Sequence, residues 1–90
     1  MKAVTNDKAR SRYAIETSHG TAIADYVING DTITFTHTHV PTALEGQGIA
    51  SRLIQFALSD ARDRGLKVVP QCSFVRVYIE RHPEWRDLLA

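Results

Sequence analysis

Hydrophobic and polar residues alternate along the first half of the chain, which is the period-two pattern of strands that bury one face. The alternation predicts strands over residues 12–17, 21–28 and 32–40. Asn29, Gly30 and Asp31 between the last two runs form a strong hairpin signal, because Asn and Gly tolerate positive φ. Pro41 supplies no backbone donor and so ends the third strand. We therefore expect an antiparallel three-stranded meander.

The second half of the chain changes to a helical period. Apolar residues recur at spacings of three and four from Gln47 to Arg64, which predicts an amphipathic helix that Gly65 terminates. A short buried strand over residues 66–69 follows, then a helix over residues 74–81 capped by Ser73, and a last helical turn starting at Pro83. This order predicts a single α+β domain of the α/β sandwich type over residues 1–90. Four aromatic side chains are expected in the core rather than in a ligand cage: Phe35, Phe56, Phe74 and Trp85.

Composition narrows the classes of function. The 11 basic and 10 acidic residues give a formal charge of +1, and the basic residues are scattered, so the chain lacks the concentrated basic face of a nucleic-acid binder. No run approaches the roughly 20 apolar residues of a membrane span, and Met1 is followed by no apolar signal segment. Cys72 is the single cysteine, which excludes an intrachain disulfide. We expect a cytoplasmic protein with neither nucleic-acid nor membrane partners.

The junction between the third strand and the long helix carries the most specific signal. A loop with Gly46 and Gly48 leads directly into the helix, and a helix N-terminus offers unpaired N–H groups and a positive dipole end. Such a junction suits a phosphate or pyrophosphate, although two glycines can also simply shape a turn. The Lys-Ser/Thr pair of a Walker loop and the third glycine of a dinucleotide fingerprint are both missing.

The segment Glu45-Gly46-Gln47-Gly48-Ile49-Ala50 resembles the coenzyme A loop of the GNAT superfamily of N-acetyltransferases, which has the form Q/R-x-x-G-x-G/A. Glu45 stands where this loop usually has Gln or Arg. The resemblance implies a minimal GNAT fold and acetyl-CoA as co-substrate, with backbone N–H groups of the loop on the pyrophosphate. It also implies an N–H donor for the thioester carbonyl near residues 38–40. The cofactor-binding residues expected on this basis are Thr38, His39, Val40, Glu45, Gly46, Gln47, Gly48, Ile49, Ala50 and Ser51.

Further motifs resemble a compact, YidJ/YjdJ-like subgroup of the same superfamily, over residues 11–89. They are His-Thr-His-Val-Pro at residues 37–41, Cys-Ser-Phe-Val at residues 72–75 and His-Pro-Glu-Trp at residues 82–85. In this subgroup a Glu is common at the position of His39, so a carboxylate base is not expected there. The resemblance also implies that the N-terminal helices and final strand pair of larger members are missing. We therefore expect a shallow acceptor site, or one that a partner completes.

Three residues are candidates for the chemistry. Cys72 lies between the last strand and the following helix, where a helix dipole lowers a thiol pKa, so it suits a nucleophile or the acid that protonates the leaving thiolate. A small buried hydrophobic side chain is the alternative for Cys72. Tyr78 is the alternative acid, or a core tyrosine. His37 and His39 share one face of a strand, and His37 suits a general base better than an edge residue or a metal ligand, because no metal-site spacing accompanies it.

The combined expectation is an acetyl-CoA-dependent N-acetyltransferase that modifies a primary amine. The acceptor is either a small molecule or a protein lysine or N-terminus, and the protein is a monomer or a weak homodimer. The alternative is a non-catalytic module that binds coenzyme A or an acyl-CoA, or a protein-interaction module. No metal is expected.

Overall fold

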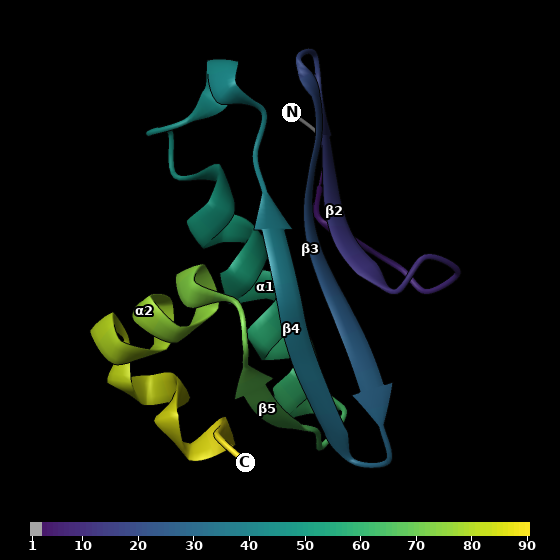
Figure 1. The fold of residues 1–90 in the computed structure, drawn as a ribbon, viewed down its shortest axis with the longest axis vertical. Coiled ribbons are helices and arrows are strands. Elements are labelled where there is room, and N and C mark those ends of the chain that lie inside the picture. The colour runs from purple at the N-terminus through teal and green to yellow at the C-terminus, as the bar shows by residue number, and fades with distance from the viewer. Residues whose placement is uncertain (1–2) are drawn as a thin grey trace.

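A mixed five-stranded sheet forms one layer of the molecule and the helices form a second layer on one of its faces (Figure 1). The computed structural model describes residues 3–90. Neighbouring strands follow the order of the sequence; the first four are antiparallel, and the last pairs parallel to the fourth. The strands are β1 (Thr5–Asp7), β2 (Arg12–Thr17), β3 (Gly20–Asn29), β4 (Thr32–His39) and β5 (Lys67–Pro70).

Two α-helices and two short 3-10 helices complete the fold. They are η1 (Thr42–Leu44), α1 (Ile49–Asp63), α2 (Ser73–Arg81) and η2 (Pro83–Leu88). The meander, the long helix, the strand after it and the C-terminal helices are confirmed, whereas β1, η1 and the parallel pairing of β5 with β4 were not predicted. The helix α1 starts two residues later than predicted, because Gly48 takes a left-handed conformation that precedes the helix. Ser73 is the first residue of α2 rather than its cap, and Cys72 occupies the N-cap position.

The core lies between the sheet and the two α-helices. Its largest fully buried side chains come from both layers: Tyr13, Phe35, Ile15, Ile33, Leu53, Ile54, Leu58, Ile79, Val68 and Val75. The expectation of a core position was correct for Phe35 and wrong for Phe56 and Phe74, whose side chains are 41% and 38% exposed. Trp85 is partly buried against the core. No helix within residues 3–90 is long and apolar enough to cross a membrane.

Polar contacts attach the helical layer to the rest of the fold. The hydroxyl of the fully buried Tyr13 on β2 donates a 2.6 Å hydrogen bond to Asp60 Oδ2 on α1. Arg62 on α1 holds η2 through two bonds to the Asp87 carboxylate of 2.8 and 2.9 Å, and its guanidinium lies over the Trp85 ring. Both contacts are made near the C-terminal end of α1, where they join the helix to β2 and to η2.

Candidate functional site

A cleft of about 490 Å³ opens where β4 ends and α1 begins. Its walls are the end of β4, the loop between η1 and α1, the first turn of α1, and one side chain of α2. The lining residues are Thr38, His39, Val40, Leu44, Glu45, Gly46, Gly48, Ile49, Ala50, Ser51 and Phe74. The cleft therefore brings together every residue expected to bind the cofactor except Gln47, whose N–H instead donates to the Leu44 carbonyl within the loop.

The backbone of the loop leaves the N-terminus of α1 open toward this cleft. Gly46 and Gly48 have φ values of 81° and 76°, which L side chains rarely adopt. A Cβ placed on either glycine would meet no atom within 4 Å. Gly48 is the N-cap of α1, and no side chain caps the helix. The first N–H groups of α1 and the positive end of its dipole are therefore free to face an anion.

A β-bulge in β4 decides which side chains face the cleft. Tyr26 of β3 pairs with Phe35, but Asp25 pairs with His37, so that Thr36 is an extra residue on β4. Bulges of this kind reverse the alternation that follows them. As a result, Thr38 faces the helical layer, like Phe35, whereas His37 and His39 share the uncovered face of the sheet. Both histidines are exposed.

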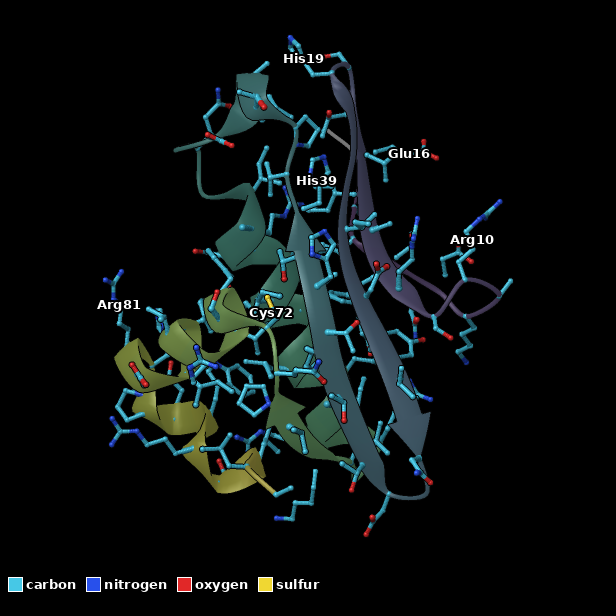
Figure 2. The ribbon with its side chains drawn as sticks, in the orientation of Figure 1. Arg10, Glu16, His19, His39, Cys72 and Arg81 are labelled. Carbon is cyan, nitrogen blue, oxygen red and sulfur yellow. The ribbon has the colours of Figure 1, made fainter. Side chains whose placement is uncertain are left out.

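The strands β4 and β5 separate at the level of this bulge. Their pairing ends at Phe35 and Pro70, and the Cys72 N–H then donates to the Phe35 carbonyl at 2.8 Å. Beyond this point β4 stays paired with β3 only, while the chain after β5 turns into α2. Figure 2 shows Cys72 at this fork, beside β4, with His39 further along the same strand. The fork is the place where a group bound in the cleft can reach both strands.

Cys72 and Thr38 face each other across the fork, with 3.3 Å between Sγ and Oγ1. Partial burial raises the pKa of the Cys72 thiol, but the Thr38 hydroxyl and the backbone N–H groups of Val75, Phe74 and Thr38 lower it by more, so the net pKa lies below its ordinary value. Hydrogen bonds that stabilise the charged form are the cause. This thiol is therefore easier to ionise than a free cysteine.

The structure does not bring Tyr78 to the cleft. Its side chain is buried on the inner face of α2, with its ring stacked on His82 at 4.0 Å between centroids. Burial raises the pKa of the Tyr78 hydroxyl, nearby Glu84 adds to the rise, and a hydrogen bond with Trp85 partly offsets it. The hydroxyl thus faces η2 and not the fork. This arrangement favours the core alternative for Tyr78, and its role as an acid stays a prediction without geometric support.

Two residues of the cleft were not predicted as site residues: Leu44, and Phe74, which was expected in the core. The sequence does contain a signal that Phe74 is exposed. The predicted buried face of this helix consists of Val75, Tyr78 and Ile79, and Phe74 lies outside it. Within residues 3–90, no three side chains of His, Cys, Asp or Glu are grouped so that they could hold a metal ion. The cleft itself therefore offers backbone donors, and the Cys72 thiol lies beside it behind Thr38, whereas the side chains of His37 and His39 belong to the other face of β4.

Comparison with known proteins identifies the family. The family model described as GCN5-related N-acetyl-transferase matches residues 12–88. Protein NATD1 of Xenopus tropicalis is 29% identical over 89% of this chain and 76% of its own length, and Protein NATD1 of Homo sapiens is 30% identical over 89% and 74%. The solution structure of a GCN5-like putative N-acetyltransferase from Staphylococcus aureus superposes with a TM-score of 0.76 at 24% identity, covering 100% of this chain and 91% of that one. The chain belongs to the GCN5-related N-acetyltransferase family.

Proposed function

We propose that this protein binds acetyl-CoA in the cleft between β4 and α1 and transfers the acetyl group to a primary amine. One observation carries the proposal: Thr38 lines the cleft at the open N-terminus of α1, and its hydroxyl lies 3.3 Å from the Cys72 thiol. An anion site alone would suit many ligands. An anion site that leads to a nucleophile and a backbone donor suits a phosphorylated thioester.

The residues of the loop fit the pyrophosphate of coenzyme A. The backbone N–H groups of Gly48, Ile49, Ala50 and Ser51 would hold it, and the absence of side chains at Gly46 and Gly48 lets it approach the backbone. Glu45 lines the same cleft with a carboxylate, so it opposes the anion instead of supporting it. Glu45 in place of the usual Gln or Arg therefore weakens the binding of the anion but does not prevent it.

Acetyl-CoA supplies a thioester carbonyl that becomes negatively charged on attack, and a fixed N–H donor stabilises that charge. The Thr38 N–H at the fork is suited to this role because it already contributes to lowering the pKa of Cys72. The Cys72 thiolate attacks the carbonyl carbon, the bond to the coenzyme A sulfur breaks, and coenzyme A leaves as a thiol after taking up a proton. The acceptor amine then attacks the acetylated Cys72, forms the amide, and releases the Cys72 thiol.

Direct transfer from acetyl-CoA to the amine is the alternative route, with Cys72 as the acid for the departing thiolate. Either route needs a neutral amine, and a lysine-like amine with a pKa of about 10.4 is neutral in only about one molecule in a thousand near pH 7.4. The small fraction of neutral amine adds roughly 4 kcal/mol to the activation free energy, and a general base that removes the proton lowers this addition. His37 is the candidate for this base, and because its side chain is exposed on the uncovered face of the sheet, it can serve only an amine that approaches the fork from that face.

Turnover of acetyl-CoA on a panel of small amines and lysine peptides, measured beside coenzyme A titration, tests the proposal. Turnover with binding supports an acetyltransferase; saturable binding without turnover indicates a coenzyme A-binding module instead. Mass spectrometry after exposure to acetyl-CoA separates the two routes, since only the first leaves an acetyl adduct on Cys72. The same adduct must be missing from Cys72→Ala.

The role of His37 has its own test in the pH profile. His37→Ala is expected to reduce turnover most near neutral pH and least at alkaline pH, where the acceptor amine loses its proton without help. His39→Ala is the matched control on the same face of β4. A profile of His37→Ala that runs parallel to the wild type would rule out the base.

A further inference from the structure

The strand β3 runs past the end of β2, so part of its outer edge has no neighbouring strand (Figure 1). Its pairing with β2 ends at Asp25, opposite Arg12, whereas its pairing with β4 continues to Asn29. The chain that leads into β2 turns away from this edge at Ser11, whose φ of 52° is uncommon for a residue with a side chain. We call residues 27–29 the open β3 edge.

Backbone groups on the open β3 edge are available to a further strand. The Tyr26 N–H points toward the β2 side, where it donates to the Ser11 carbonyl at 3.0 Å. The backbone groups of a strand alternate in direction, so those of Ile28, two residues further on, point the same way. No backbone group within residues 3–90 bonds to Ile28 on this side. An extended peptide can therefore continue the sheet by pairing with Ile28.

The side chains at this edge are apolar and exposed. Val27 and Ile28 are 56% and 38% exposed, and as neighbours on a strand they point to opposite faces of the sheet. A hollow of about 410 Å³ lies beside them, lined by Lys8, Ser11, Tyr26, Val27, Ile28 and Arg64. A strand added here would therefore cover apolar surface in addition to forming backbone hydrogen bonds.

The charged side chains that line this hollow are all positive. Lys8 is exposed, and its ammonium makes no hydrogen bond or ion pair within the described part of the chain. Arg64 contacts Asp60 and Tyr13, but a guanidinium has five N–H groups and so keeps donors for a further acceptor. No acidic side chain among residues 3–90 lines the hollow. A segment that complements it must therefore carry carboxylates.

The two outer edges of the sheet are less suited to strand addition. Along β5, the Ala90 N–H already donates to the Val68 carbonyl, and Pro70 has no N–H to offer. The strand β1 has only three residues, which are Thr, Asn and Asp, so its edge offers no large apolar side chain. Among the described strands, the open β3 edge therefore combines free backbone groups with exposed apolar surface.

We propose that the open β3 edge binds an extended segment of a partner protein in which apolar and acidic residues alternate. The segment pairs with the backbone of Ile28. Its alternation places apolar side chains beside Val27 on the uncovered face of the sheet and carboxylates on the helical face, within reach of Lys8 and Arg64. This surface lies at the opposite end of β4 from the cleft, so the proposal does not depend on the proposed function.

A titration of the ¹⁵N-labelled protein with a synthetic peptide of three Glu-Val repeats, acetylated and amidated at its ends, tests the proposal. The amides of residues 27–29 are expected to shift saturably, and the Ile28 N–H is expected to exchange with solvent more slowly. Lys8→Glu should raise the dissociation constant about two- to fivefold at low salt, and less at high salt. The matched control is Arg81→Glu, which changes an exposed cation at the outer end of α2 (Figure 2) and should leave the constant unaltered.

The opposite results are equally clear. Amides of residues 27–29 that do not respond to the peptide would overturn the proposal. Equal binding of a peptide of three Lys-Val repeats, or equal weakening by Lys8→Glu and Arg81→Glu, would refute the acidic partner. If the same amides shift when the protein alone is concentrated, a second copy of the chain occupies the edge and the proposed partner is wrong. Melting temperatures of the variants show whether these exposed substitutions leave the fold in place.

Discussion

Replacing Gly48 with alanine separates two properties of this position: its left-handed backbone conformation, and the space that it leaves for a ligand beside the backbone N–H groups. Gly48 is the N-cap of α1 with a φ of 76°, and a Cβ there meets no atom within 4 Å. Alanine therefore fits the free protein without a clash, and its only cost is the left-handed backbone, about 1–2 kcal/mol. For a domain of this size, each kcal/mol lowers the melting temperature by about 4–8 °C.

The effect on ligand binding is expected to be larger than the effect on stability. The added methyl group stands in the cleft that Gly48 lines and moves the pyrophosphate away from the backbone N–H groups. One lost hydrogen bond to a charged group costs about 1.5–3 kcal/mol. The dissociation constant for coenzyme A should therefore rise about 10–100-fold.

Gly65→Ala is the matched control. Gly65 follows the other end of α1, has a φ of 70°, and would also bring a Cβ into open space. The two variants should lose similar stability in thermal unfolding followed by circular dichroism, but only Gly48→Ala should lose affinity in calorimetry with coenzyme A. If both variants bind coenzyme A equally well, the reasoning about close approach to the backbone is wrong.

Three further predictions concern charge, the thiol and the core. Glu45→Gln removes a carboxylate from the cleft and should tighten coenzyme A binding about two- to fivefold in calorimetry at low salt, and less at high salt; an unchanged affinity would contradict repulsion by Glu45. Because the pKa of Cys72 is lowered, its alkylation rate should reach its plateau at a lower pH than that of free cysteine, and Thr38→Val should move the profile upward; a profile like that of free cysteine would contradict this. Tyr13→Phe should lower the free energy of unfolding by about 1–3 kcal/mol in denaturant titration, with coenzyme A affinity unchanged, since the hydroxyl it removes bonds to Asp60 and Arg64, neither of which lines the cleft.

The parts of the fold that follow from local signals could be predicted from the sequence. The turn at residues 29–31 works because Gly30 adopts a φ of 62°, and the alternation on either side of it places Ile33 and Phe35 in the core. The amphipathic pattern of α1 likewise identifies its buried residues, including Leu53 and Leu58. The loop that follows β4 could be recognised because its two glycines and the start of a helix are adjacent in the chain.

The remaining features depend on pairing between distant segments. Strict alternation would put His37 on the same face as Phe35, but the register with β3 inserts Thr36 as an extra residue and turns His37 to the uncovered face. The short polar strand β1 exists only because β2 supplies its partner groups. The exposure of Phe74 likewise reflects the cleft beside it, since an aromatic residue in a short helix is by composition alone a core candidate.

A titration of the ¹⁵N-labelled protein with acetyl-CoA, followed by amide chemical shifts, tests the central proposal most directly. The amides of Gly48, Ile49, Ala50 and Ser51, together with that of Thr38, are expected to shift saturably, while the amide of Gly30 in the distant hairpin stays in place. Amides that do not respond to acetyl-CoA, or responses confined to residues outside the cleft, would contradict the account.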